Sequence, residues 1–174
     1  MAYNFLVERA IEDDLEEIAG LNRECFPDDN PDFGRAYGWI KAHFVGTNLH
    51  TYFVGMLDER MVGYIQWTRL GGFRNEAVLE LDDIGVTEEF RGKGFGTQLI
   101  QKSLIDYVEH TLKPAGETLR LVKVGTGASN DAQRVYRTAL GAEVSSTDRD
   151  VYDGDEVNMF ARKAQLEQAL GISL

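Results

Sequence analysis

The spacing of apolar residues divides the chain into segments of two kinds. Runs that alternate apolar with polar residues predict strands, whereas apolar residues three or four positions apart predict helices. Leu15, Ile18 and Leu21 follow the helical spacing, and residues 163–174 show a short pattern of the same kind. The predicted strands cover residues 3–9, 51–57, 61–68, 77–86, 118–124, 144–152 and 156–162, and the predicted helices cover residues 11–25, 36–45, 97–112 and 130–140.

The alternation changes phase within the strand predicted over residues 77–86. Apolar residues stand at odd positions up to Leu81 and at even positions from Ile84 onward. Since a strand keeps one phase unless a residue is inserted, the change predicts a β-bulge at Asp82 and Asp83. Such a bulge would separate the strand from its neighbour and leave backbone amides for a ligand. The alternative is that the two aspartates lie on a solvent-facing edge.

A glycine-rich segment follows this strand and precedes a predicted helix. Residues 91–96 read Arg-Gly-Lys-Gly-Phe-Gly. Glycines let the backbone approach a ligand closely, and the N–H groups and dipole of a helix N-terminus favour a bound phosphate. The segment is not an ATP-binding P-loop, because Lys93 is not followed by Ser or Thr. It is not a dinucleotide fingerprint either, whose third glycine falls one residue later than Gly96.

This segment resembles the Arg/Gln-x-x-Gly-x-Gly/Ala loop of the GCN5-related N-acetyltransferases, the GNAT family. The resemblance includes the strand that ends Ile84-Gly85-Val86 and the helix that follows the loop. The predicted order β-α-α-β-β-β-α-β-α-β-β matches the family fold over nearly the whole chain. The resemblance implies an α/β fold, with a mixed central sheet flanked by helices on both faces, in a single domain over residues 1–174.

The resemblance also implies that acetyl-CoA is the co-substrate and that its contacts are mostly with the backbone. An amide near Val86 is expected to face the thioester carbonyl, and Asn130 is assigned to the cofactor as well. The pantetheine contacts fall on Ile84 and Val86, and the pyrophosphate contacts fall on Arg91, Gly92, Lys93, Gly94, Phe95, Gly96 and Thr97.

For the acid that protonates the leaving thiolate, the resemblance points to Tyr136. The segment from Ser129 to Tyr136 resembles the family's Asn-x-x-Ala-x-x-x-Tyr pattern. Aligning Tyr136 places Ser129 at the usual Asn position, whereas aligning Asn130 places Arg137 at the Tyr position. We prefer the register with Tyr136. The alternative interpretation of this side chain is a core aromatic.

For the base that removes a proton from the attacking amine, the first candidate is Glu80. It lies where some family members, the histone-acetylating ones included, carry a glutamate base. An ordinary polar residue on an alternating strand is the alternative. Asp82, Asp83 and a water relay are further candidates for the base, and either aspartate is also a candidate ligand for an ammonium group of the acceptor.

Charge and composition exclude some functions. The chain of 174 residues has a net charge of −11 at pH 7, which argues against nucleic-acid binding. The charge is compatible with a cationic substrate such as an amine, and the simpler interpretation is that it keeps the protein in solution. No apolar run is long enough to span a membrane, and the N-terminal residues show no signal peptide. The one cysteine, Cys25, excludes a disulfide framework and a multi-cysteine zinc site. We therefore expect a cytoplasmic protein with no bound metal and no membrane partner.

The identity of the amine acceptor is not predicted, because a fold does not fix a substrate. The family's acceptors range from protein amino termini and lysines to polyamines, antibiotics and amino acids. Phe33, Tyr37, Trp39 and Phe44 are candidates for lining the acceptor pocket, with helix core as the alternative. Two other functions stay open, namely an acyl-CoA sensor without turnover and a transferase of another acyl group. Family members are commonly dimers, so a homodimer is one of the expected states.

Overall fold

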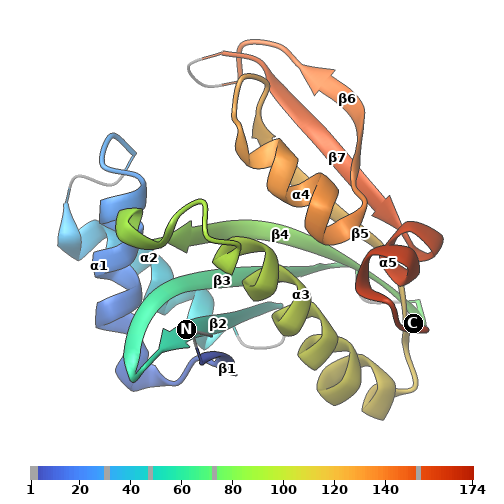
Figure 1. Cartoon of the computed structure of the whole chain (residues 1–174), viewed down its shortest axis with the longest axis horizontal. Helices are drawn as coiled ribbons and strands as arrows, with labels where there is room; N and C mark the ends of the chain where they lie inside the picture. Colours follow the sequence, from blue (N-terminus) through green and yellow to red (C-terminus); the bar gives the residue numbers. More distant parts are fainter. Residues whose placement is uncertain (1–3, 30–31, 47–48, 72–73, 152–153) are drawn as a thin grey trace. The chain divides into compact units, whose positions relative to one another are not determined.

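The computed structural model of the chain describes residues 4–29, 32–46, 49–71, 74–151 and 154–174 (Figure 1). The strands are β1 (Phe5–Arg9), β2 (His50–Leu57), β3 (Arg60–Leu70), β4 (Glu76–Val86), β5 (Thr118–Gly127), β6 (Glu143–Asp148) and β7 (Glu156–Arg162). The helices are α1 (Leu15–Cys25), α2 (Phe33–Val45), α3 (Phe95–Tyr107), α4 (Ala132–Leu140) and α5 (Lys163–Leu170). A π-helical turn, Val108–Leu112, continues α3, where the sequence predicts one helix to residue 112.

The strands form one seven-stranded sheet in the order β1-β2-β3-β4-β5-β7-β6. β1 and β2 are antiparallel, β4 and β5 are parallel, and β7 is antiparallel to both β5 and β6. The sheet is therefore mixed, and the helices flank it, which confirms the predicted α/β class.

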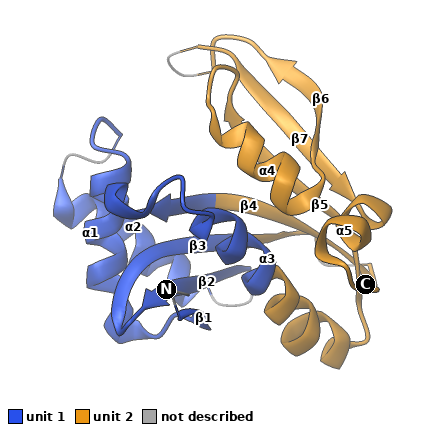
Figure 2. Cartoon of the chain, in the orientation of Figure 1, with its two compact units in different colours: residues 1–67, 83–103 blue, residues 68–82, 104–174 orange. Residues whose placement is uncertain are grey.

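The chain divides into two compact units (Figure 2). Unit 1 comprises residues 1–67 and 83–103, and unit 2 comprises residues 68–82 and 104–174. β3, β4 and α3 contribute residues to both units, so the division does not follow the ends of elements. The single domain over residues 1–174 stays a prediction.

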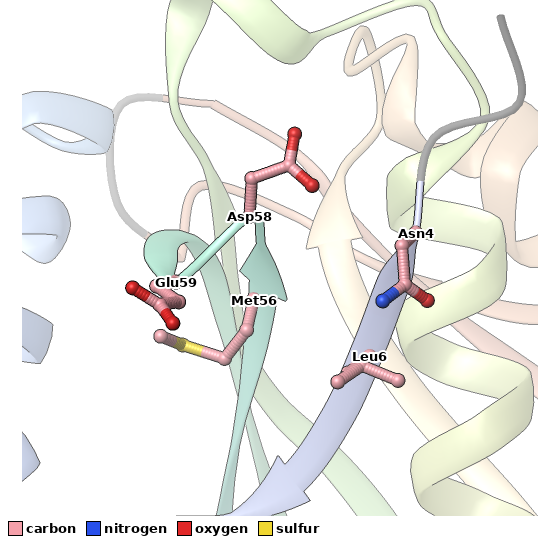
Figure 3. A pocket seen from close by; sticks show the side chains of 5 residues that line it. All are labelled: Asn4, Leu6, Met56, Asp58 and Glu59. Carbon is pink, nitrogen blue, oxygen red and sulfur yellow. The ribbon is translucent and has the colours of Figure 1, made fainter.

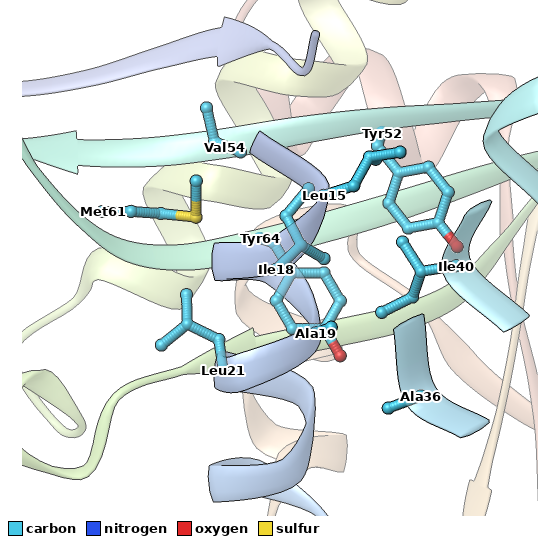
Figure 4. Packing of buried hydrophobic residues seen from close by; sticks show 10 residues of the cluster. All are labelled: Leu15, Ile18, Ala19, Leu21, Ala36, Ile40, Tyr52, Val54, Met61 and Tyr64. Atoms are coloured by element: carbon cyan, nitrogen blue, oxygen red, sulfur yellow. The ribbon is translucent and has the colours of Figure 1, made fainter. Parts of the chain in front are cut away.

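The core of unit 1 lies where α1 and α2 meet β2 and β3 (Figure 4). The stripe predicted from Leu15, Ile18 and Leu21 is the buried face of α1, because side chains three and four residues apart lie on one side of a helix. α1 begins later than predicted: Ile11 is 60% exposed, and a 3₁₀ turn separates it from Leu15. The cluster comprises Leu15, Ile18, Ala19, Leu21, Ala36, Ile40, Tyr52, Val54, Met61 and Tyr64.

Ile18→Ala is expected to lower the free energy of unfolding by about 2–5 kcal/mol, because the truncation leaves a cavity in a packed core. Ile18 is fully buried in α1. The matched control is Glu16→Ala on the exposed face of the same helix, with an expected change within about 0.5 kcal/mol. Urea unfolding followed by circular dichroism measures both, and similar losses in the two variants would contradict this description of the core.

α2 begins earlier than predicted, at Phe33 instead of residue 36. The Asp32 carboxylate caps the helix by accepting a hydrogen bond from the N–H of Arg35 (2.8 Å). The cap explains the additional turn, which the apolar spacing alone does not mark.

Unit 2 contains the first part of β4 together with β5, β6, β7, α4 and α5. α4 ends, as predicted, at Gly141, which has φ of +67°. A Cβ there would lie 3.2 Å from the backbone oxygen of Gln165, so both the conformation and the contact with α5 favour glycine. β5 continues to Gly127, beyond its predicted end, and β6 ends at Asp148, before its predicted end.

Candidate active site

The glycine-rich loop joins β4 to α3 in unit 1. Gly92 and Gly94 have φ of +72° and +85°, values at which other residues are strained. A Cβ on either glycine would meet no atom within 4 Å. The conformation therefore favours glycine at these positions, and the space beside the backbone is open.

The loop presents the N-terminus of α3 at the surface. Residues 91–94 are exposed, whereas Phe95 is buried and anchors the first turn of the helix. The N–H of Gln98 bonds to the oxygen of Gly94 (3.1 Å), which marks the first turn of the helix. In any α-helix the first N–H groups have no acceptor further back within the helix. An exposed helix start with glycines at positive φ is suited to an anionic group such as a pyrophosphate.

Of the two cations in the loop, Arg91 is bonded to the end of β4. Its Nε donates a hydrogen bond to the backbone oxygen of Val86 (2.8 Å). The Lys93 ammonium lies 5.1 Å from the centre of the Phe90 ring. Arg91 therefore holds the strand end in place in addition to supplying charge, a contact that the sequence did not reveal.

β4 keeps one phase to its end. Its buried side chains stand at odd positions up to Leu81, and Gly85 is also buried, whereas Ile84 and Val86 are half-buried at even positions. The change of phase predicted at Asp82–Asp83 does not occur in this burial pattern. Ile84 and Val86 therefore lie at the even positions of the strand with half-buried side chains.

The pairing of β4 with β5 has a register shift between Ala77 and Val78, several residues before the predicted bulge at Asp82–Asp83. The ladder ends at the pair Leu81↔Val124, although β4 continues to Val86. This pairing therefore ends before Asp82 and Asp83, where the sequence predicts the bulge.

The last part of β4 packs closely against β3 and α1. A Cβ on Gly63 would lie 2.8 Å from the oxygen of Gly85, and a Cβ on Gly85 would lie 2.7 Å from the Tyr64 ring and 2.9 Å from Cys25 Sγ. Glycine is required at both positions because larger side chains would collide with backbone or ring atoms.

The C-terminal turn of α1 is bonded to the same region. Cys25 Sγ donates to the oxygen of Val86 (3.6 Å), and the N–H of Glu88 donates to Glu24 Oε1 (3.0 Å). Burial raises the pKa of the Cys25 thiol, although the neighbouring Arg91 acts in the opposite direction. Cys25 is therefore a protonated packing residue at neutral pH.

A polar network lies beside these contacts in unit 1. Tyr64 Oη donates to Asp83 Oδ2 (2.6 Å), and Asn22 Nδ2 donates both to Asp83 Oδ2 (2.9 Å) and to Tyr64 Oη (2.7 Å). Tyr64 and Asn22 are buried, whereas Asp83 is half-buried. Burial raises the pKa of Tyr64 well above its usual value, and the Asp83 carboxylate adds to this effect.

The other two candidate carboxylates of β4 lie in unit 2, and both have partners there. Glu80 Oε1 forms an ion pair with Lys123 Nζ (2.8 Å), because the parallel register places these residues opposite each other. Asp82 is exposed and accepts a hydrogen bond from Thr68 Oγ1 (3.1 Å). The predicted base is thus a half-buried, paired carboxylate.

α4 carries the remaining candidates. Asn130 Oδ1 accepts a hydrogen bond from the N–H of Ala132 (2.8 Å), so its side chain caps the helix. Tyr136 is buried, whereas Arg137 is exposed and bonds to Gln133 Oε1 (2.9 Å). The two alternative registers thus place either a buried or an exposed side chain of this helix at the position of the acid.

The aromatic side chains of α2 differ in their surroundings. Trp39 is 63% exposed and meets His43 edge to face, with ring centres 4.2 Å apart. Phe33 is also exposed and stacks on Tyr37, whereas Tyr37 and Phe44 pack against the core. The helix-core interpretation therefore holds for Tyr37 and Phe44 and is wrong for Trp39 and Phe33.

Comparison with known families identifies the fold that holds these elements. A family model described as the Acetyltransferase (GNAT) family matches residues 15–142, which include the glycine loop, β4 and α4. The chain belongs to the GNAT family. This confirms the family that the glycine loop and its flanking elements indicated.

One curated relative of this GNAT chain is an N-alpha-acetyltransferase from Saccharolobus solfataricus. It is 31% identical over 108 residues, and the match covers 58% of this chain and 61% of the archaeal protein. The chain therefore spans less than two thirds of that relative.

Solved structures share the fold at low sequence identity. A spermidine N-acetyltransferase from Vibrio cholerae has a TM-score of 0.71 at 19% identity, covering 95% of this chain and 98% of that one. A putative acetyltransferase from Salmonella typhimurium, solved with its cofactor acetyl-CoA, has a TM-score of 0.66 at 19% identity, covering 91% and 93%. A ribosomal-protein-alanine N-acetyltransferase from Brucella melitensis has a TM-score of 0.68 at 18% identity, covering 90% and 99%.

A surface pocket of about 590 Å³ lies at β1 and the β2–β3 turn of this GNAT chain (Figure 3). Its lining includes none of the predicted site residues, so we do not identify it with the candidate active site. It is lined by Asn4, Leu6, Met56, Asp58 and Glu59.

The predicted site residues of the GNAT chain form two groups, one in each unit. Unit 1 contains Ile84, Val86 and the loop 91–97, whereas unit 2 contains Glu80, Asn130 and Tyr136. Within the described ranges, no three His, Cys, Asp or Glu side chains are grouped so that they could hold a metal ion. None of the helices in the described part of the chain has the length and apolar character needed to cross a membrane.

Proposed function

We propose that this protein transfers an acetyl group from acetyl-CoA to a primary amine, by direct attack in a ternary complex. The observation that carries the proposal is the exposed start of α3, where Gly92 and Gly94 adopt positive φ. Backbone N–H groups of residues 91–97 would hold the pyrophosphate, and Ile84 and Val86 would contact the pantetheine arm. Asn130, which caps α4, is the remaining proposed cofactor residue.

The reaction requires a neutral amine, a donor for the oxyanion and a proton for the leaving thiolate. The amine nitrogen attacks the carbonyl carbon of the thioester and forms the C–N bond, the C–S bond breaks, and the proton lost by the nitrogen balances the one gained by sulfur. We assign the oxyanion donor to a backbone amide near Val86, the base to Glu80 and the acid to Tyr136. Glu80 Oε1 is paired with Lys123 Nζ in the same unit.

The relatives support a primary amine as the acceptor class. One structural neighbour is a spermidine N-acetyltransferase, another is a ribosomal-protein-alanine N-acetyltransferase, and the curated relative is an N-alpha-acetyltransferase. The acceptors named in these descriptions differ in size and charge but share an amino group. A cytoplasmic location agrees with the single cysteine.

Acetyl-CoA at about one hundred times its dissociation constant is expected to stabilise the protein by about 2.7 kcal/mol. For a chain of this size that corresponds to a rise in melting temperature of roughly 5–10 °C. The same sample is then incubated with a panel of primary amines, and free thiol is followed to detect turnover. Stabilisation without thiol release from any amine would favour the acyl-CoA sensor, and propionyl-CoA in place of acetyl-CoA tests for transfer of another acyl group. No stabilisation at all would overturn the proposal.

A further inference from the structure

Phe90 directly precedes the glycine-rich loop, and two cations lie over its ring. The Arg60 guanidinium is 5.5 Å from the centre of the ring, and the Lys93 ammonium is 5.1 Å from it. A cation within roughly 6 Å of the centre is attracted to the negative face of an aromatic ring. Arg60 is the first residue of β3, whereas Lys93 belongs to the loop itself, so one side chain holds cations from two segments.

The cations near this ring differ in how their charge is used. Arg60 forms an ion pair with Glu89 Oε2 (3.1 Å), and Arg91 donates to the backbone oxygen of Val86 (2.8 Å). In the described part of the chain, Lys93 forms no ion pair. The aromatic ring attracts the ammonium and brings no net negative charge, so Lys93 keeps its full charge for an anion.

The ring itself is fixed by its packing. Phe90 is buried and meets Phe95 edge to face, with ring centres 5.8 Å apart, and Phe95 in turn lies 4.8 Å from the ring centre of Phe5. Lys93, in contrast, is on the exposed part of the loop. A lysine side chain loses much conformational entropy when it is ordered, and a fixed neighbour that orders it beforehand lowers this cost on binding.

The surroundings make a cation at this position valuable to an anionic cofactor. The chain has a net charge of −11, and Glu88 and Glu89 form the 3₁₀ turn that ends at Phe90. Such a charge repels an anion unless a local cation offsets it. Lys93 lies between Gly92 and Gly94, the glycines at positive φ in the loop proposed for the pyrophosphate.

We propose that Phe90 is a positioning residue of the cofactor site, whose ring holds the Lys93 ammonium where it binds a phosphate group of acetyl-CoA. Phe90 acts through Lys93 and not through the reacting atoms. The cofactor carries phosphate both in its pyrophosphate and at the 3′ position of its ribose, and both present the same chemistry to an ammonium group. This inference rests on the proposed function, because it requires acetyl-CoA at this loop.

The test is a double-mutant cycle on the affinity for acetyl-CoA, measured by calorimetry. Lys93→Met removes the charge and keeps a long side chain, and is expected to weaken binding about tenfold. Phe90→Leu removes the ring and keeps an apolar side chain, and is expected to weaken binding about two- to fivefold. In the Lys93→Met background, Phe90→Leu is expected to cause no further loss. An equal loss in both backgrounds would show that the ring acts by packing alone, and would overturn the inference.

Two further variants of these residues strengthen the cycle. Lys93→Arg keeps both the charge and the ability to lie over a ring, and is expected to bind within about threefold of the wild type. Phe90→Met gives the same cycle with another apolar side chain if Phe90→Leu is poorly folded. A repeat with acetyl-dephospho-CoA, which lacks the 3′-phosphate, separates the two sources of phosphate. Coupling that persists assigns Lys93 to the pyrophosphate, and coupling that disappears assigns it to the 3′-phosphate.

The matched control is Phe53→Leu, the same substitution at a fully buried ring on β2 that has the Arg9 guanidinium 5.4 Å from its centre. It is expected to lose similar stability and to keep the affinity for acetyl-CoA. Arg60→Met is expected to change this affinity by less than about twofold, since Glu89 already offsets the charge of Arg60.

The outcomes separate this inference from the proposed function. Coupling of Phe90 to Arg60 in place of Lys93, or the same loss of affinity in Phe53→Leu as in Phe90→Leu, overturns the inference while the proposed function stands. A wild-type protein that does not bind acetyl-CoA overturns the proposed function, and the inference with it.

Discussion

Gly94→Glu is expected to abolish binding of acetyl-CoA, with a dissociation constant raised at least about a hundredfold. Gly94 lies at the start of α3 with φ of +85°, in the loop proposed to hold the pyrophosphate. The new side chain fills the open space beside the backbone and brings a negative charge to a site proposed for an anion. A hundredfold change corresponds to about 2.8 kcal/mol, which a charge reversal of this kind can supply where water is partly excluded.

The loss of affinity in Gly94→Glu must be distinguished from a general loss of stability, because any side chain at positive φ is strained by about 1–2 kcal/mol. Gly116→Glu is the matched control. Gly116 has φ of +71°, and a Cβ there also meets no atom within 4 Å, but it lies in unit 2, outside the loop. We expect both variants to lose similar stability and only Gly94→Glu to lose affinity in calorimetry. Equal affinity for acetyl-CoA in the two variants would contradict the assignment of the pyrophosphate to this loop.

Tyr136→Phe is expected to lower kcat by about 10²–10⁴-fold, because it removes the group proposed to protonate the leaving thiolate. The affinity for acetyl-CoA is expected to change little, since the ring is retained. The side chain is buried on α4, so the loss of one hydroxyl preserves the packing. Steady-state kinetics with an acceptor from the panel measures the effect.

Arg137→Ala distinguishes the two registers of α4. Arg137 is exposed, and its guanidinium bonds to Gln133 within the same helix. In the register that we prefer, this variant keeps kcat near the wild-type value. A large loss for Arg137→Ala together with a small loss for Tyr136→Phe would instead show that the register with Asn130 is correct and that Tyr136 is a core aromatic.

The sequence predicted the elements whose signals are local. The glycine loop was found because positive φ and a helix start leave their marks within a few residues, as Gly92 and Gly94 show. Most helix and strand positions followed from apolar spacing for the same reason. The predicted starts of α1 and α2 were less accurate, since the 3₁₀ turn before α1 and the cap of Asp32 on α2 depend on single side-chain contacts.

The sequence misread the end of β4 because it took every apolar residue as a mark of the buried face. Ile84 and Val86 are apolar but half-buried, and the strand keeps its phase through Gly85. An apolar side chain on a partly open face has the same sequence signal as one in the core. Burial separates the two, and burial depends on what packs against the strand.

The sequence by itself determined the family, the fold class and the loop proposed for the cofactor, because these depend on residues that are neighbours along the chain. Only the tertiary structure decided that Glu80 is paired with Lys123 and that Tyr64 and Asn22 donate hydrogen bonds to Asp83. Lys123 lies opposite Glu80 through the register of two strands, and Asn22 reaches Asp83 from a helix far away in sequence. Contacts of this kind are set by packing between distant segments, which no local pattern of residues encodes.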